Sequence, residues 1–146
     1  MSFTGTLPSE IGRLSTLKLA RFNNMLLSGA IPTEIGQLSA LTSFVAYSNR
    51  LTGSLPSQLG HALSLQTLYL ESNAISGPVP SELGLLSSSL VELQAGYLSL
   101  GGIVPSELGL LSALTILVLS GSNLFGLGSS TLLSRRDVLR CVESQA

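Results

Sequence analysis

The sequence predicts an α/β solenoid, a coil built from short repeated turns, and three observations support this fold class. A five-residue phrase, Pro-Ser/Thr-Glu/Gln-Ile/Leu-Gly, occurs five times, and successive prolines are 24, 24, 24 and 25 residues apart. The phrase begins at Pro8, Pro32, Pro56, Pro80 and Pro105. A leucine pattern follows the phrase, and charged residues make up only 10% of the chain. A fixed period in this range indicates a solenoid, because one repeat cannot bury its apolar side alone.

The five-residue phrase predicts a short 3₁₀ or helical turn on the convex side of the coil. A serine or threonine after the proline can cap such a turn, and the glycine can end it. The fourth repeat has one extra residue, in Ser87-Ser88-Ser89. We therefore expect the fourth turn to be irregular.

The leucine pattern predicts a short strand in each repeat. It has the form Leu-x-x-Leu-x-Leu, as at Leu65, Leu68 and Leu70, and its last part alternates with period two. Stacking of the repeats places equivalent residues in columns. We expect the leucine columns to form the core, and the strands to pair in a parallel ladder at ~4.8 Å on the concave side.

An interior polar column follows the strand in each repeat. Asparagine in this column would satisfy backbone groups at the bend, since its amide carries both donors and acceptors. The column holds Asn49 and Asn73 but elsewhere Met25, Leu98 and Ser122. We therefore expect the first turn, like the fourth, to be irregular.

These interlocking positions resemble the plant-type class of the leucine-rich repeat family. The segments from Asn49 to Pro56 and from Asn73 to Pro80 match the family pattern closely, and the resemblance covers about residues 3–126. The chain is most similar to an ectodomain segment of receptor-like members. The resemblance implies that outward-facing ladder residues bind the ligand, and that the chain is extracellular or at the cell surface. The sequence itself shows no signal peptide and no transmembrane segment, and leaves the localisation unknown.

The pattern divides the chain into two parts. Residues 1–128 form the predicted solenoid of five units of about 24 residues, starting in mid-repeat, and residues 129–146 form a helical cap or tail. Within the second part, Ser130 to Glu143 fits an amphipathic capping helix with Leu132, Leu139 and Val142 on one side. The family's usual N-terminal cap with paired cysteines is absent, so we expect an open strand edge that permits a homodimer.

The composition argues against catalysis, cofactor binding and nucleic-acid binding. Seven Lys and Arg against eight Asp and Glu leave no basic stripe. The only histidine, His61, and the only cysteine, Cys141, lie far apart in the repeat order, so neither a Cys–His pair nor a metal cluster is expected. The recurring glutamates fit the N-terminal ends of helical turns. We predict a non-enzyme without catalytic, cofactor or metal residues.

The outward columns of the ladder supply the candidate ligand-binding residues. All three tyrosines of the chain fall on them, and tyrosine joins apolar area to a hydrogen-bonding tip. An alternative is that tyrosine merely suits a half-exposed strand. The predicted site consists of Arg21, Tyr47, Tyr69, Glu71, Gln94 and Tyr97.

The function predicted from these residues is recognition of a protein, peptide or glycan partner through the concave face. A ladder of this size presents only about 300 Å², well below the ~800 Å² per partner of a stable protein interface. One alternative is an inhibitor of a cell-wall-degrading enzyme, similar to polygalacturonase inhibitors. Another is a structural or decayed repeat fragment without a ligand. A further alternative is ice binding through the hydroxyl column Ser9, Thr33, Ser57, Ser81 and Ser106.

Overall fold

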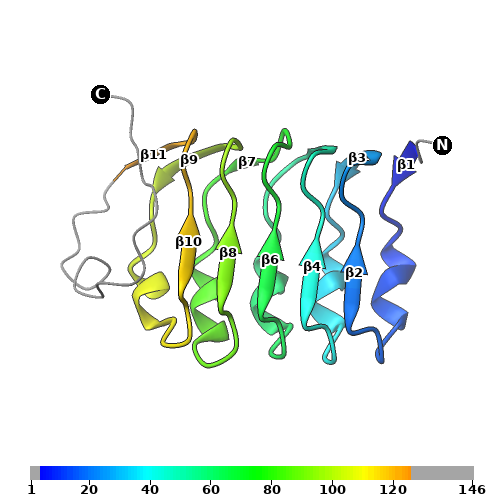
Figure 1. The fold of residues 1–146 in the computed structure, drawn as a ribbon, viewed down its shortest axis with the longest axis horizontal. Helices are drawn as coiled ribbons and strands as arrows, with labels where there is room; N and C mark the ends of the chain where they lie inside the picture. The colour runs from blue at the N-terminus through cyan, green and yellow to red at the C-terminus, as the bar shows by residue number, and fades with distance from the viewer. Residues whose placement is uncertain (1–3, 126–146) are drawn as a thin grey trace.

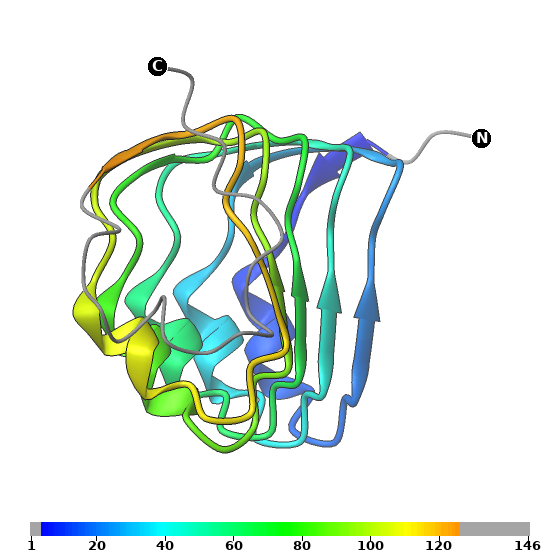
Figure 2. The same ribbon diagram turned by 60° about the vertical axis from the view of Figure 1, so that its left-hand side comes forward.

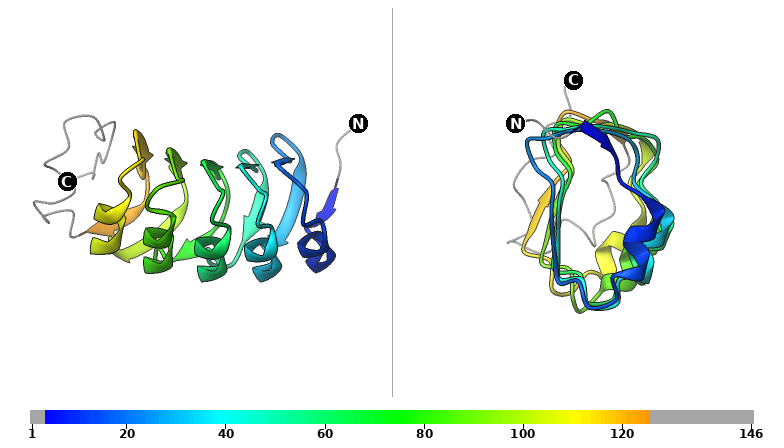
Figure 3. Two further views of the ribbon diagram at one scale, coloured as in Figure 1. Left: turned by 90° about the horizontal axis from the view of Figure 1, so that it is seen from below. Right: turned by 90° about the vertical axis from the view of Figure 1, so that its right-hand side faces the viewer.

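The predicted solenoid is confirmed. The computed structural model describes residues 4–125, which run through successive turns of a coil that lie side by side (Figure 1). The turns superpose closely when they are viewed along the length of the coil (Figure 3). Each turn passes from a 3₁₀ helix to a ladder strand and then to a second short strand.

A five-stranded parallel sheet forms the ladder, which faces the viewer in Figure 1. Its strands are β2 (Leu19–Arg21), β4 (Ser43–Val45), β6 (Thr67–Tyr69), β8 (Glu92–Gln94) and β10 (Ile116–Val118). The register pairs Ser43 with Thr67 and Thr67 with Glu92. The repeat alignment therefore predicted the register correctly, including the one-residue shift in the fourth repeat.

A second strand in each turn was not predicted. These strands are β1 (Thr4–Thr6), β3 (Leu26–Ala30), β5 (Arg50–Thr52), β7 (Ser76–Gly77), β9 (Ser99–Ile103) and β11 (Asn123–Phe125). They form two three-stranded parallel sheets, and a bridge between Ser54 and Ser76 links the two. The glycines in this region, such as Gly29 and Gly53, have φ of +74° and +75°. Glycine suits these positions because it enters the left-handed region without steric cost.

Five 3₁₀ helices lie on the side of the coil opposite the ladder (Figure 2). They are η1 (Ser9–Arg13), η2 (Thr33–Gln37), η3 (Ser57–His61), η4 (Ser81–Leu86) and η5 (Ser106–Leu110). The preceding proline holds the chain extended and its carbonyl accepts the first helical bond, as from the Ile11 N–H to Pro8 at 3.1 Å.

The expectation that Ser or Thr caps these helices is wrong. The N-cap position is proline, and no side chain makes a capping hydrogen bond. In four of the five phrases the hydroxyl instead donates to the carboxylate of the next residue, as from Thr33 Oγ1 to Glu34 Oε2 at 3.2 Å. The 3₁₀ turns are therefore held by proline geometry and packing between turns.

The glycine of each phrase has a different role from the one predicted. Gly60 lies inside η3, which continues to His61, so the glycine does not end the helix. A Cβ at Gly60 would lie 2.2 Å from the carbonyl oxygen of Glu82, and one at Gly36 would lie 2.2 Å from that of Gln58. Glycine is needed because the backbone of the next turn approaches too closely for a side chain.

The expected irregularity is found in the fourth turn. Helix η4 has six residues where η1, η2, η3 and η5 have five, and Ser87 after it is α-helical in φ and ψ. The extra residue of the fourth repeat is therefore accommodated at the end of η4. In the first turn, η1 has the common length of five residues, and the irregularity lies in the strand after Met25. Where the asparagine is replaced, by Met25 and Leu98, the strand that follows has five residues.

The two asparagines bind the backbone at the bend as predicted. Asn73 Oδ1 accepts from the Leu51 N–H at 2.9 Å, and Asn73 Nδ2 donates to the carbonyls of Ala46 and Leu70, each at 2.9 Å. Asn49 makes the equivalent bonds one turn earlier, to the Leu27 N–H and the Phe22 carbonyl. Each amide thus joins two successive turns.

The leucine columns form one continuous core. Leu41, Leu65 and Leu90 are fully buried, and Phe44 packs edge-on against Phe22 with ring centroids 6.2 Å apart. In the first turn the core column is open, because Leu14 is 52% exposed whereas every later member of its column is buried.

Several sequence predictions lie outside the described residues. These are the domain of residues 129–146, the capping helix from Ser130 to Glu143, and the position of Cys141. None of the helices between residues 4 and 125 has the length and apolarity needed to span a membrane.

Candidate ligand-binding face

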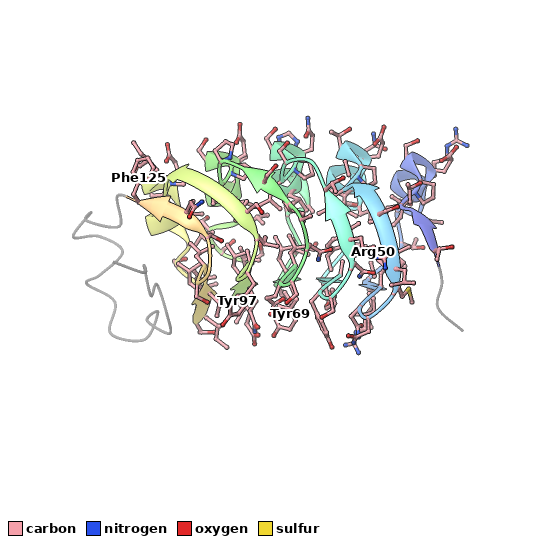
Figure 4. The ribbon with its side chains drawn as sticks, turned by 90° about the horizontal axis from the view of Figure 1, so that it is seen from above. Arg50, Tyr69, Tyr97 and Phe125 are labelled. Atoms are coloured by element: carbon pink, nitrogen blue, oxygen red, sulfur yellow. The ribbon has the colours of Figure 1, made fainter. Side chains whose placement is uncertain are left out.

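The candidate site lies on the ladder face, which we define as the outward side chains of the five-stranded sheet and of the three residues that follow each strand. Tyr69 and Tyr97 project from the same side of the coil, whereas Arg50 and Phe125 lie on other sides (Figure 4). Tyr47 and Tyr69 are half-buried, and Tyr97 is 70% exposed. The prediction that the tyrosines face outward from the core is confirmed.

Tyr69 is held by two polar residues of the next strand. Its hydroxyl donates to Glu92 Oε2, and Gln94 lies beside it in register. Burial, the hydrogen bond to Glu92, and the charges of Glu92 and Glu71 raise the pKa of Tyr69 from 10.0 to about 12, and Gln94 offsets part of the rise. The ring is thus fixed in one orientation on the face.

We expect Tyr69 to remain protonated in alkaline solution until about pH 12. Because folding raises this pKa, the stability that it contributes is complete below the ordinary value of 10.0 and is lost as the pH rises towards 12. The difference in ultraviolet absorbance between wild type and Tyr69→Phe measures the titration of this one phenol. Glu92→Gln should lower the Tyr69 pKa, and an unchanged titration would contradict the assigned hydrogen bond.

Glu71 has an unusual carboxylate. Its Oε2 atom is shielded from solvent and has no hydrogen-bond partner among the described residues. Burial raises the pKa of Glu71, and the backbone N–H groups of Glu71 and Leu70 offset part of that rise. A shielded, unpaired carboxylate oxygen carries a desolvation cost, and these backbone groups compensate for only part of it.

We expect Glu71→Gln to stabilise the isolated chain at neutral pH. Folding raises the Glu71 pKa, so the related stability is present below its ordinary value of 4.5 and is lost as the pH rises through the higher folded value. The variant should melt about 1–2 °C higher at pH 7, as for a change of ~0.5 kcal/mol. The gain should vanish at about pH 4. The matched control is Glu82→Gln on an exposed glutamate of η4, and equal melting of all three proteins at pH 7 would contradict the prediction.

Tyr97 has a strained backbone. Its φ is +54°, in the left-handed region that bulky residues rarely enter. Equivalent positions hold Asn24, Ser48, Ser72 and Gly121. A Cβ at Gly121 would lie 2.7 Å from the Tyr97 ring, so the glycine in the next turn leaves room for that ring. The fold therefore bears a conformational cost to present an exposed aromatic ring.

The parallel pairing continues beyond the strands and brings the other residues together. The Ser48 N–H donates to the Glu71 carbonyl at 2.9 Å, so the backbone after Tyr47 runs beside Glu71. Asn23 Nδ2 donates to the Tyr47 hydroxyl at 3.2 Å and steadies that ring. In contrast, Arg21 pairs with Val45, which in turn pairs with Tyr69. Arg21, which the sequence assigns to the same site, therefore lies two strands from Tyr69.

Sequence reasoning places Glu92, Asn23 and Gly121 on the outward columns of the ladder but does not assign them to the binding site. The signal for Glu92 was its diagonal position relative to Tyr69. Tyr69 pairs with Gln94, and Glu92 lies two residues before Gln94 on the same face, within reach of a long side chain. The space for the Tyr97 ring at Gly121 depends on backbone geometry.

Comparison with known proteins agrees with the geometry. The family model described as Leucine Rich Repeat matches residues 64–86, which contain the third ladder strand and the fourth Pro-Ser-Glu-Leu-Gly phrase. The repeat unit that contains these residues also occurs before and after them along the described solenoid. The chain belongs to the leucine-rich repeat family.

Three solved structures that are similar to this leucine-rich repeat chain are of plant proteins. The ectodomain of the Arabidopsis thaliana receptor kinase GASSHO1/SCHENGEN3, in complex with CASPARIAN STRIP INTEGRITY FACTOR 2, has a TM-score of 0.89 and 31% identity over 94% of the chain. The Arabidopsis receptor kinase HAESA, in complex with the peptide hormone IDA and the co-receptor SERK1, has a TM-score of 0.87 and 32% identity over 94% of the chain. A plant ice-binding protein has a TM-score of 0.77 and 30% identity over 83% of it.

The leucine-rich repeat chain spans only part of these proteins. It covers 16% of the GASSHO1/SCHENGEN3 chain, 23% of the HAESA chain and 39% of the ice-binding protein. No curated protein matches its sequence. The likeness therefore concerns the repeats themselves, which are of the plant type.

Elsewhere on the leucine-rich repeat coil, an open groove of about 600 Å³ runs between the second strands and the 3₁₀ helices. Ile31, Leu55, Pro56, Pro78 and Pro80 are among its lining residues. His61 is exposed at the end of η3. Over residues 4–125 no three His, Cys, Asp or Glu side chains gather closely enough to hold a metal ion.

Proposed function

We propose that the chain is a non-catalytic recognition module that binds a peptide or a protein segment on its ladder face. The observation that carries this proposal is that Tyr69 and Tyr97 project from that one face (Figure 4) and that the half-buried Tyr47 lies one turn earlier on it. Partly exposed, oriented tyrosines supply contact area at a low entropic cost. Two similar plant receptor kinases were crystallised with such partners: GASSHO1/SCHENGEN3 with CASPARIAN STRIP INTEGRITY FACTOR 2, and HAESA with the peptide hormone IDA. These complexes support a peptide-binding role for the present chain.

The size of the face favours a short segment over a folded partner. Five strands at ~4.8 Å spacing extend about 20 Å, enough for a few extended residues. Buried area well below ~800 Å² per partner gives weak or transient binding. A tight complex would need more repeats, a co-receptor or a second copy of the chain.

The test is selection of a random-peptide phage library on the folded chain. We expect Tyr69→Ala to reduce capture of the selected phage about tenfold, which corresponds to ~1.4 kcal/mol for a central aromatic contact. Leu85→Ala removes an exposed side chain on η4, on the opposite side of the coil, and should leave capture unchanged. Equal capture by all three proteins would exclude the ladder face as the site. A glycan array under the same conditions distinguishes a carbohydrate ligand.

Tyr97→Asn provides a second test of this proposal, because its stability and its peptide capture can be measured separately. Asparagine tolerates the left-handed region and occupies the equivalent position at Asn24. We expect the variant to gain about 0.5–1 kcal/mol of stability while losing peptide capture. Loss of both stability and capture would indicate that Tyr97 acts as a structural residue.

A second candidate function is ice binding, which the similar plant ice-binding protein favours. In the column suggested by the sequence, Ser9, Thr33, Ser81 and Ser106 each bond to a neighbouring glutamate. The charged carboxylates beside these hydroxyls hold a hydration shell that does not match ice, so this column is a poor ice-binding surface. On the second-strand side, one row of hydroxyls follows the ~4.8 Å strand spacing. It consists of Ser54, Ser76 and Ser99, which pair with one another in register.

Thermal hysteresis and inhibition of ice recrystallisation test this candidate. If this row binds ice, Ser76→Lys should abolish the activity because it inserts a charge between Ser54 and Ser99. Ser57→Lys, in the column along the 3₁₀ helices, should leave the activity intact. Absence of ice-growth inhibition in the wild-type chain would exclude this function.

A further inference from the structure

The outer side of the last two 3₁₀ helices carries a pair of exposed leucines. Leu85 in η4 is 56% exposed, and Leu110 in η5 is 62% exposed. They occupy equivalent positions in successive turns, and both line one shallow hollow of about 240 Å³. The same position holds polar residues in the first three turns, namely Arg13, Gln37 and His61. At this position, apolar side chains are therefore confined to the two turns nearest the C-terminal segment.

Two glutamates border the leucine pair. Glu82 and Glu107 line the same hollow, and both are exposed. Each carboxylate accepts a hydrogen bond from the serine before it, at 3.4 and 3.2 Å. Neither carboxylate forms an ion pair with a cationic side chain of residues 4–125. A segment that fits this surface combines apolar side chains with positive charges spaced like successive turns.

The C-terminal segment of the chain starts within reach of this surface. Strand β11, in the last described turn, ends at Phe125, and residues 126–146 follow it. In the turn before, only Val104 and Pro105 separate β9 from η5, so a short connection leads from a second strand to the outer side. Residues 126–129 can extend about 13 Å, which exceeds the ~10 Å span of two turns. The segment that begins at Ser130 can therefore reach both η4 and η5.

The same segment has the matching chemistry. Its sequence pattern predicts a helix with Leu132, Leu139 and Val142 on one side. Arg136 and Arg140 are four residues apart, and a helix brings such residues to within about 6 Å of each other. This spacing is close to the ~4.8 Å between the turns that hold the two glutamates.

We propose that residues 130–143 cover the outer side of η4 and η5, as an intramolecular contact of this chain. Leu132 and Leu139 pack on the exposed leucine pair, and Arg136 and Arg140 lie opposite Glu82 and Glu107. Exposed ion pairs contribute little each, so the leucine contact supplies most of the attraction and the charges set its orientation. The 3₁₀ helices lie opposite the ladder (Figure 2), so this contact leaves the ladder face open to a ligand.

The test uses a nitroxide spin label on Cys141, the only cysteine of the complete chain. At about 100° per residue, a helix places Cys141 about 180° from Leu132, so the label points away from the contact. We expect the amide NMR signals of Leu85 and Leu110 to lose most of their intensity. Those of Gln94 and Val118, in the ladder strands of the same two turns, should retain theirs.

Charge reversal tests whether the contact is specific. Glu82→Arg combined with Glu107→Arg should abolish the loss of signal, because like charges then face each other. Adding Arg136→Glu and Arg140→Glu to that variant should restore the loss, because the charges are again opposite.

The matched control is Glu10→Arg combined with Glu34→Arg, the same change on η1 and η2, which should leave the loss of signal intact. Retained signals at Leu85 and Leu110 would overturn the proposal, with circular dichroism showing that the chain is folded. Equal losses in η5 and β10 without any loss in η4 would also overturn it, because the segment would then cover the end of the coil. A loss seen only when the label and the isotope are on different molecules would assign the surface to a second copy and overturn the intramolecular contact.

Discussion

Gly60→Ala is expected to lose about 3 kcal/mol of unfolding free energy, at the upper end of typical overpacking costs. The added Cβ would lie 2.2 Å from the carbonyl oxygen of Glu82 and 2.7 Å from its carbonyl carbon. Both are backbone atoms of the next turn, so no side-chain rotation can make room. Relief requires η3 and η4 to move apart, which opens the leucine core beneath them. Urea unfolding followed by circular dichroism measures the loss.

The control for this prediction is Gly101→Ala. Gly101 lies in β9, and the nearest atom to its added Cβ would be the Asn123 carbonyl oxygen at 3.7 Å, an ordinary contact. We expect a change within about 0.5 kcal/mol there. If Gly60→Ala proves as stable as this control, the glycine column does not set the spacing between turns.

Asn73→Ala is expected to cost about 3 kcal/mol. The substitution removes the acceptor of the Leu51 N–H and the donors to the carbonyls of Ala46 and Leu70. Each bond contributes about 1 kcal/mol net, and the partly buried backbone groups left without partners add a desolvation cost. The loss should appear in urea unfolding with an unchanged m-value, because the same surface is exposed on unfolding.

Asn123→Ala is the matched control for the asparagine prediction. Asn123 is exposed in β11, and its side chain makes no hydrogen bond within residues 4–125, so its removal should change stability by less than about 0.5 kcal/mol. Equal losses at the two positions would show that the bend is stabilised by leucine packing alone. Leu98 occupies the same column one turn later and is itself buried in the core. The fourth turn thus uses apolar packing where the third uses an amide.

Both stability predictions concern contacts between turns, and the prediction of the binding face depends on the same stacking. The outward position of Tyr69 followed from its place between Leu68 and Leu70, because neighbouring strand residues point to opposite sides. Its pairing with Gln94 followed from the repeat spacing. The bond to Glu92 did not follow, since it depends on the rotamers of two long side chains.

The sequence by itself determined the coil, its core columns and the ladder register. Period-two alternation within a fixed repeat leaves only one way to bury the leucines of every turn together. Tertiary structure alone decided the shielded oxygen of Glu71, the strain at Tyr97 and the close approach at Gly60. These features depend on differences of a few tenths of an ångström in the spacing between atoms of successive turns. A repeat pattern specifies which residues become neighbours, but the packing of the folded chain decides how closely they approach.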